Sequence, residues 1–176
     1  VWFTTKHPSV CIKCSTGCSI DVWGNTNGQY RVTPRKNMDV NQWWMCDDGR
    51  SAYQWLNPEY RYLTALERAD DQMVFAETAT TVAAFHNTLS KHLASTTWLI
   101  SPQHTTEEYQ VMFQFFKTKK VPADRVFFWY DRPEKINNFD QFLIRGDKNP
   151  NSRGLKQSAE AAGYVVDVQR FKKSFL

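Results

Sequence analysis

The sequence has no apolar run long enough to span a membrane. Its most apolar stretches, residues 111–116 and 126–130, are far shorter than the roughly 20 residues that a spanning helix needs. The first ten residues have neither the basic start nor the apolar centre of a signal peptide. We therefore expect a soluble chain without direct membrane insertion. Because it begins with valine, we also expect a piece of a longer protein.

The excess of positive over negative charge is small as well. The chain has 22 basic and 18 acidic residues, and its basic side chains gather only at residues 117–120 and 170–173. Nucleic-acid-binding domains concentrate a larger basic surplus on one surface, so we expect no nucleic acid partner. The sequence also lacks internal repeats, and Gly146, Gly154 and Gly163 do not form a dinucleotide-binding loop.

Catalytic constellations are missing too. The sequence shows no serine–histidine–acid set, no pair of catalytic carboxylates and no metal-hydrolase spacing. The histidines are scattered and are interpreted as ordinary surface or core residues: His7, His86, His92 and His104. We therefore predict no catalytic residue and no self-contained active site in this chain.

Aromatic residues are plentiful, at 15% of 176 residues, and indicate a globular chain whose interior is packed with rings. All four cysteines lie in the first 50 residues, whereas helical patterns begin only after residue 77. We therefore predict a small cysteine-bearing module over residues 1–57 and an α/β region over residues 58–176. This length allows one ordinary domain or such a pair, but not two full-sized domains.

Strand patterns surround a turn in the first part. Residues 19–23 and 29–33 alternate at the strand period across the turn residues 24–28, which predicts a β-hairpin directly after Cys18. Residues 49–56 predict a short helix that stops at Asn57 and Pro58. Further along, residues 63–66 and 73–75 are expected to form a second hairpin or a linker.

Helix and strand patterns alternate in the second part, which favours a parallel sheet with crossover helices. Apolar residues at helical spacing predict a helix containing Val82, Phe85, Leu89 and Leu93. Thr105 and Glu108 have capping-box spacing before a helix that carries Tyr109, Met112, Phe113 and Phe116. The expected buried strands are residues 98–100, 125–130 and 164–168, and a last helix is expected at 155–162. The predicted fold class is therefore α+β to α/β.

The cysteines follow the spacing C-x2-C-x3-C-x27-C, at Cys11, Cys14, Cys18 and Cys46. Iron–sulfur clusters are held by four cysteine thiolates, and a tight trio with a distant fourth is a common way to surround them. We therefore predict that these four residues hold one [4Fe–4S] cluster. Three alternatives stay open: a structural zinc site, a disulfide framework and a redox-active pair at Cys11 and Cys14.

Residues 11–50, CIKCSTGCSIDVWGNTNGQYRVTPRKNMDVNQWWMCDDGR, carry a resemblance to a known family. The cysteine spacing, the Gly17–Cys18 step, Asn37, Asn41 and the closing C-D-x-G-R motif resemble the iron–sulfur segment of the molybdopterin-oxidoreductase superfamily. Within it, they look most like the large iron–sulfur subunit of NADH:quinone oxidoreductase, respiratory complex I. The resemblance continues more weakly through residues 61–77 and through residues 143–154, an Asn-rich turn.

The resemblance implies a [4Fe–4S] electron carrier that works inside a multi-subunit NADH dehydrogenase of the respiratory chain. It implies other complex subunits as partners, and a location peripheral to the membrane on its cytoplasmic or mitochondrial-matrix side. The alternative is a fragment of a molybdenum or tungsten bis-pterin oxidoreductase. Those enzymes usually carry lysine where this chain has Asp48, so the acid favours the respiratory subunit.

Several neighbours of the cysteines are candidate tuning residues. Four basic side chains are candidates to offset the negative charge of the cluster: Lys13, Arg31, Arg35 and Arg50. Trp43 and Trp44 are candidates to shield it from water, although packing of the module explains them equally well. The composition of residues 147–151 predicts a turn. The resemblance implies that a small anion or a partner subunit could contact this turn.

Overall fold

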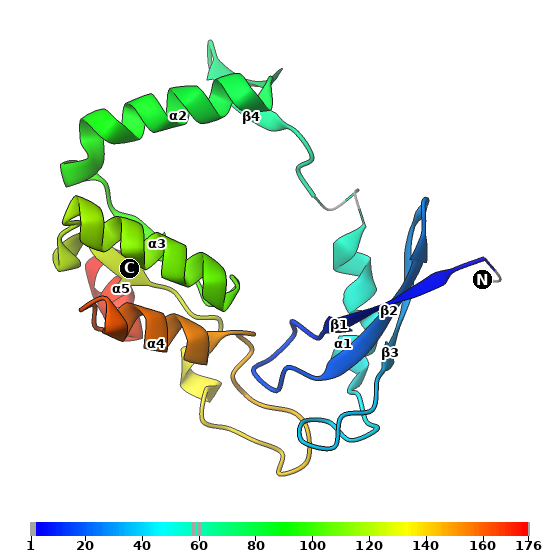
Figure 1. Ribbon diagram of the computed structural model, residues 1–176. Coiled ribbons are helices and arrows are strands. Elements are labelled where there is room, and N and C mark those ends of the chain that lie inside the picture. The colour runs from blue at the N-terminus through cyan, green and yellow to red at the C-terminus, as the bar shows by residue number, and fades with distance from the viewer. Residues whose placement is uncertain (1–2, 58, 60, 176) are drawn as a thin grey trace.

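The computed structural model describes residues 3–57, 59 and 61–175 and contains three small sheets separated along the chain (Figure 1). Helices and strands are mixed, and the sheet of the cysteine part is antiparallel. This is an α+β arrangement, which is the coarser form of the predicted fold class. Among the described residues, no helix is long and apolar enough to cross a membrane.

The first sheet has the order β1 (Thr5–Val10), β2 (Ser19–Asn25) and β3 (Gly28–Pro34), all antiparallel. The predicted hairpin is confirmed as β2 and β3. Strand β1 escaped prediction because all six of its residues are exposed, so it has no apolar alternation. It pairs only with β2, and an edge strand of this kind tolerates Pro8.

A short helical segment follows the sheet. It consists of α1 (Asp47–Arg50) and the 3-10 helix η1 (Ser51–Leu56). The prediction of a short helix ending before Asn57 is confirmed, although the helical segment starts two residues earlier than expected; Pro58 lies outside the described residues. The side chain of Asn57 accepts a hydrogen bond from the backbone N–H of Gln29 at 3.1 Å, which ties this segment to β3.

The second hairpin is also confirmed, as β4 (Ala65–Ala69) and β5 (Gln72–Ala76). Its two turn residues, Asp70 and Asp71, have φ angles of 46° and 64°, as a two-residue turn between right-twisted strands requires. Helix α2 (Thr78–His92) follows, with a 3-10 turn, η3 (Leu93–Ser95), at its end.

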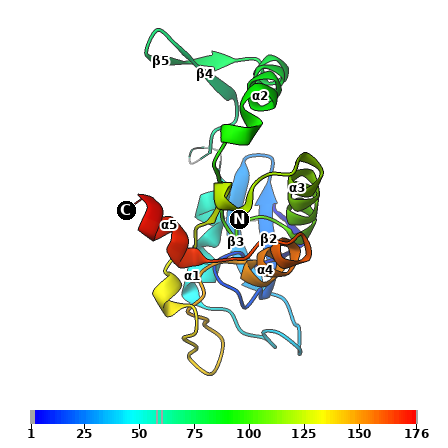
Figure 2. The same ribbon diagram turned by 90° about the vertical axis from the view of Figure 1, so that its left-hand side faces the viewer.

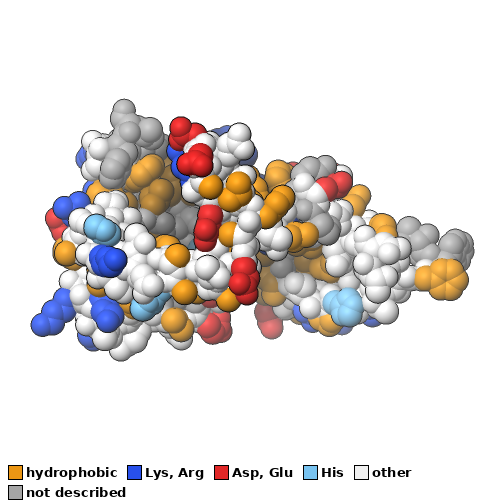
Figure 3. Space-filling view, turned by 90° about the horizontal axis from the view of Figure 1, so that it is seen from above, with side chains coloured by type: hydrophobic (Ala, Val, Ile, Leu, Met, Phe, Trp, Pro, Cys, Tyr) orange, Lys and Arg blue, Asp and Glu red, His pale blue; other side chains and the backbone are white. Residues whose placement is uncertain are grey.

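The apolar residues of α2 do not form the buried face that their spacing predicts. None of the residues of α2 is buried, and Val82 and Phe85 are 60% and 64% exposed. The hairpin and α2 stand apart from the other elements in both ribbon views (Figures 1 and 2). Seen from above, the surface of the molecule shows hydrophobic side chains scattered among polar ones (Figure 3). The predicted helix is therefore confirmed, but the buried apolar face that its spacing predicts is not observed.

The larger core surrounds one parallel crossover unit. Strand β6 (Trp98–Ile100) pairs in parallel with β7 (Val126–Phe128), and α3 (Thr106–Lys119) connects them. The predicted capping box is confirmed: Thr105 accepts from the Glu108 N–H and Glu108 accepts from the Thr105 N–H. Helix α4 (Ser152–Ala161) packs beside α3, and two 3-10 turns, η4 (Ala123–Arg125) and η5 (Pro133–Lys135), flank β7.

The strand predicted at residues 164–168 is wrong. Residues 164–167 pair with no strand in the described part of the chain, and helix α5 (Val168–Phe175) begins at Val168. Asp167 accepts hydrogen bonds from the backbone N–H groups of Gln169 and Arg170, so it starts a helix rather than continuing a strand. Tyr164 is buried as a single side chain that donates to the carbonyl of Val121 at 2.8 Å. The parallel sheet therefore has two described strands.

Candidate metal centre

The loop between β1 and β2 brings the first three cysteines together. Cys11 follows β1 and Cys18 precedes β2, and the Cys11 N–H donates to the Cys18 carbonyl at 2.8 Å to close the loop. Gly17 allows the tight return, since its φ of +64° is one that side chains disfavour. Cys11, Cys14 and Cys18 are 6%, 7% and 5% exposed. Three thiols therefore lie in the interior of the module.

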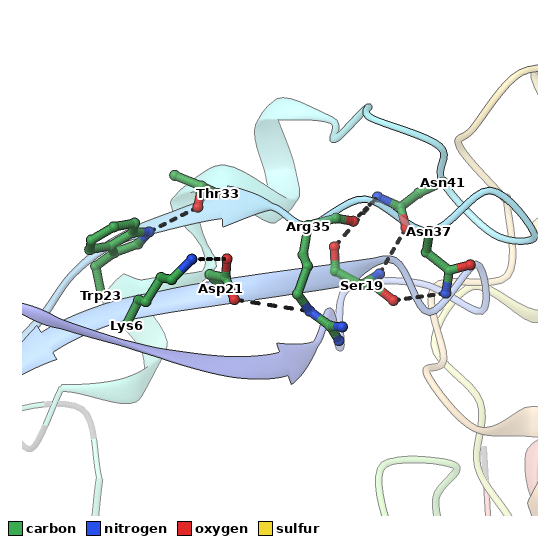
Figure 4. A network of polar contacts seen from close by, with 8 residues as sticks. All are labelled: Lys6, Ser19, Asp21, Trp23, Thr33, Arg35, Asn37 and Asn41. Carbon is green, nitrogen blue, oxygen red and sulfur yellow. Dashed lines mark hydrogen bonds and ion pairs between the residues drawn. The ribbon is translucent and has the colours of Figure 1, made fainter.

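Asn41 lies in the segment after β3, and its side chain connects this segment to the cysteine loop (Figure 4). Its side chain is 2% exposed and accepts from the Ser19 N–H at 2.9 Å. Its amide group donates to the carbonyls of Ser19, Arg35 and Trp44 at 3.4, 3.4 and 3.0 Å. Because Ser19 follows Cys18 and Trp44 lies two residues before Cys46, this one side chain links the two ends of the proposed ligand set.

Cys46 lies half-buried at the N-terminus of α1. Gly49, three residues later, packs against the cysteine loop so closely that an added Cβ would lie 3.3 Å from the Cys11 Sγ and 2.8 Å from the Met45 Cε. A side chain at position 49 would push α1 away from Cys11. The glycine of the closing C-D-x-G-R motif therefore allows α1 to approach the three-cysteine loop.

Cys11 and Cys18 lie in one apolar cluster, and Cys46 packs against it. Burial, together with negative charge on Cys11, Cys14 and Cys46, raises the pKa of Cys18 to about 11. Burial also raises the pKa of Cys11, with Cys14 and Cys46 contributing in the same direction. All four are free thiols, with no disulfide among them. A cation or cationic cluster would relieve this repulsion, because thiolates are the form that binds metal.

The donor set fits a [4Fe–4S] cluster. Four cysteine sulfurs from both ends of one module are the ligands that such clusters take, and the backbone N–H of Lys13, hydrogen-bonded to Cys11, is a donor of the kind that tunes them. Among the described residues, no three His, Cys, Asp or Glu side chains form a group that could hold a single metal ion.

The predicted tuning residues lie in different surroundings. Lys13 is close to the cysteines, since its charge lowers the pKa of Cys11, and its ammonium lies 5.3 Å from the Trp55 ring. Arg31 instead lies 4.8 Å from the Trp23 ring, and Arg35 pairs with Asp21 at 3.9 Å. Arg50 is exposed at the last turn of α1.

The two tryptophans before Cys46 do not form a buried shield. Trp43 and Trp44 are 60% and 55% exposed. The Trp43 ring lies 4.7 Å from the Lys36 ammonium, and the Trp44 ring meets the Phe142 ring edge-on at 5.7 Å. The histidines also lie apart from the cysteines in their contacts: His7 bonds Thr5, and His104 faces Glu108 at 3.7 Å.

Residues 143–148 also reach the cysteine module, which sequence reasoning missed. Leu143 is buried in the same apolar cluster as Cys11 and Cys18, and the Ser15 N–H donates to the Asp147 carbonyl at 2.9 Å. Two segments about 130 residues apart in sequence are thereby joined. The similarity of residues 143–154 to the family gave a signal, but spacing alone does not reveal which surface a distant turn contacts.

Comparisons with known proteins find similarity in the first part of the chain. The molybdopterin oxidoreductase Fe4S4 domain family matches residues 4–58. Relatives include NADH-quinone oxidoreductase subunit 3 of Thermus thermophilus, 31% identical over 75 residues, and an NADH-quinone oxidoreductase subunit of Escherichia coli, 32% identical over 73 residues. The corresponding subunit of Pseudomonas fluorescens is 37% identical over 60 residues.

The matched segments are a large share of this chain but a small share of those proteins. They cover 43%, 42% and 34% of this chain, but 10%, 8% and 7% of the respective relatives. The family match indicates a [4Fe–4S] cluster as the cofactor. Residues 4–58 are thus similar to the molybdopterin oxidoreductase Fe4S4 domain, and this part of the chain resembles iron–sulfur subunits of NADH-quinone oxidoreductase.

Proposed function

We propose that Cys11, Cys14, Cys18 and Cys46 hold one [4Fe–4S] cluster and that the chain carries electrons within an oxidoreductase of the NADH-quinone type. The observation that carries the proposal is the placement of free thiols from both ends of one module together: Cys11 and Cys18 lie in one apolar cluster and Cys46 packs against it. When bound, the cluster supplies reversible one-electron transfer. The chain's own residues hold it, keep water from three of its four ligands and set its electrostatic surroundings.

The proposed organisation follows from this role. Residues 1–57 form the cluster module, and residues 58–176 form an α/β region that supports it. The cofactor chemistry needs no general base or nucleophile from this chain, so substrate reactions take place on other subunits of a respiratory complex. Such a chain works at the periphery of the membrane, on the cytoplasmic or matrix side, through contact with those subunits.

A bis-pterin molybdenum or tungsten enzyme is the second candidate, because the matching family is named for molybdopterin oxidoreductases. The charges at position 48 favour the electron carrier. Asp48 is an acid and pairs with Lys148 at 3.5 Å. Metal analysis separates these candidates from a zinc-stabilised interaction module: molybdenum or tungsten with pterin supports the pterin enzyme, and zinc without sulfide supports the module.

Anaerobic reconstitution with iron and sulfide tests the proposal. We expect about four iron and four sulfide per wild-type chain and an electron paramagnetic resonance signal after reduction. Cys46→Ser should lose or change this signal because one ligand is replaced. Thr118→Val, a substitution on the exposed side of α3, is the control and should behave as wild type. A chain that incorporates no iron, or a Cys46→Ser variant with an unchanged signal, would contradict the ligand assignment.

A further inference from the structure

Residues 143–148, the cover segment, lie against the three-cysteine loop although they belong to the second part of the chain. The cover segment passes beside the loop that carries residues 36–46 (Figure 1), where Phe142 meets Trp44. Leu143, 6% exposed, packs in the apolar cluster that contains Cys11, Cys18 and Met45. The cover segment therefore completes the wall around the thiols.

Thr16 connects the cover segment to a proposed ligand. Its hydroxyl donates a hydrogen bond to the Leu143 carbonyl at 2.7 Å and accepts one from the Cys14 Sγ at 3.4 Å. The neighbouring Ser15 N–H donates to the Asp147 carbonyl at 2.9 Å. Two consecutive residues of the cysteine loop are thus bonded to the two halves of the cover segment.

The cover segment is held in shape from its other side as well. One carboxylate oxygen of Asp140 accepts from the N–H groups of Phe142, Leu143 and Ile144, at 2.7 to 2.9 Å, which presents Leu143 to the module. Asn149, fully buried, bonds both the carboxylate of Asp147 and the backbone of Asp131. The cover segment is therefore anchored near the end of β7 and is not a free loop.

The ion pair between Lys148 and Asp48 adds a weaker anchor. The two groups are 3.5 Å apart, but the Asp48 side chain is 66% exposed, and exposed pairs contribute little. The hydrogen bonds of Thr16 and Ser15 and the burial of Leu143 contribute more than this ion pair to anchoring the cover segment. Each of them removes polar or apolar groups from water.

We propose that residues 143–148 are the outer wall of the cluster site, and that Thr16 is the positioning residue that keeps this wall closed over Cys11, Cys14 and Cys18. The inference rests on the proposed function in its reference to a cluster, but the closure itself is a property of the chain. Access of small reagents to the three thiols is then limited by the local opening of the cover segment.

Thiol alkylation of the reduced, metal-free chain tests the closure without a cluster. Iodoacetamide is added anaerobically, and labelling at each cysteine is followed by mass spectrometry. Thr16→Val removes the hydroxyl but keeps the shape of the side chain. We expect Cys11, Cys14 and Cys18 to be labelled about five-fold faster in this variant, which is the factor for one lost hydrogen bond. Thr16→Ser should restore the slow rate, because it keeps the hydroxyl.

Two matched controls separate closure from general stability. Thr118→Val makes the same chemical change to a hydroxyl that bonds only within α3, to the Gln114 carbonyl. Lys148→Met removes the weaker anchor and should accelerate labelling less than Thr16→Val does. Lys156→Met removes the ion pair with Glu160 on α4 and should leave the labelling rate unchanged. Equal labelling rates in wild type and Thr16→Val, or acceleration by Thr118→Val of the same size, would overturn the proposal.

Release of iron to a chelator from the reconstituted chain provides the second measurement. Thr16→Val should release iron several-fold faster than wild type and Thr16→Ser, with the same starting spectrum. A wild-type chain that takes up no iron refutes the proposed function, while the alkylation rates still decide whether the wall exists. A chain that takes up iron but loses it at equal rates in all variants refutes the wall alone.

Discussion

Single buried polar side chains organise the cysteine module at the residue scale. Asn41 is the clearest example, because it satisfies four backbone groups on both sides of the ligand set. Asn37 supports it by donating to the Ser19 hydroxyl at 3.0 Å (Figure 4). Buried polar groups stabilise a structure only when they are bonded, so these side chains fix one path for the loop between β3 and Cys46.

We predict that Asn41→Ala destabilises the chain by about 1–3 kcal/mol, because it leaves buried backbone groups without partners. The free energy of unfolding in denaturant measures this loss. Asn87→Ala is the matched control: Asn87 is exposed on α2, where alanine is the better helix former, so stability should not fall. Equal stability of Asn41→Ala and wild type would show that the network is not needed for folding.

At the scale of elements, helix starts are encoded locally and strands are not. The capping box at Thr105 and Glu108 lies within four residues, so the sequence contains all of it. Residues 164–168 have an equally strong strand pattern, but a strand needs a partner at its edge. Here Asp167 caps α5, and the Tyr164 ring packs against Phe113 and Phe116 instead.

The capping box predicts a pH dependence of stability. The Thr105 N–H donates to the Glu108 carboxylate and holds its pKa below the ordinary value of 4.5. A carboxyl group with a lowered pKa in the folded state contributes stability above its unfolded pKa, and this contribution is lost as pH falls through the folded pKa. We expect wild type to be more stable than Glu108→Gln at neutral pH.

The two unfolding curves should converge as the carboxylate is protonated below about pH 4. Chemical unfolding at a series of pH values, followed by circular dichroism, measures the difference. The substitution Glu107→Gln, one residue earlier in the same first turn, controls for the general effect of charge near a helix N-terminus. A constant difference between wild type and Glu108→Gln at all pH values would contradict this account.

At the scale of the whole molecule, the described residues form two separate apolar clusters. One surrounds Phe113, Phe116 and Leu155 between α3, α4 and the parallel strands, and the other surrounds Cys11, Cys18 and Leu143. They share no described residue. The buried residues of the larger cluster are all aromatic or aliphatic. The smaller cluster includes Cys11 and Cys18, and Cys46 packs against it.

Removal of the metal should therefore affect the two clusters differently. We predict that chelation of iron from the reconstituted chain lowers, without abolishing, amide hydrogen-exchange protection in residues 11–46. Metal binding contributes folding free energy to a small module, while the hydrogen bonds to residues 143–148 do not depend on the metal. Protection in α3 and α4 should persist. Mass spectrometry of exchanged peptides measures both regions in one sample. Equal loss in both regions would show that the clusters unfold as one unit.

Spacing and residues close together in the chain were enough to predict the hairpin of β2 and β3, the capping box and most helices, and they gave the cysteine spacing on which the proposed ligand set rests. The sequence also carried enough of the family pattern to indicate the cofactor. The edge strand β1 and the missing strand at 164–168 show its limit. Pairing depends on a partner element, and exposed or capped residues hide that dependence.

The fold of the chain was needed to show what surrounds the proposed ligands. It placed Gly49 against the Cys11 sulfur, exposed Trp43 and Trp44, and brought Leu143 and Asp147 to the cysteine loop. It also left Val82 and Phe85 of α2 exposed, although their spacing predicts burial. The physical reason is the same in each case: burial and long-range hydrogen bonds depend on which distant surfaces meet, and periodicity along the chain does not record that meeting.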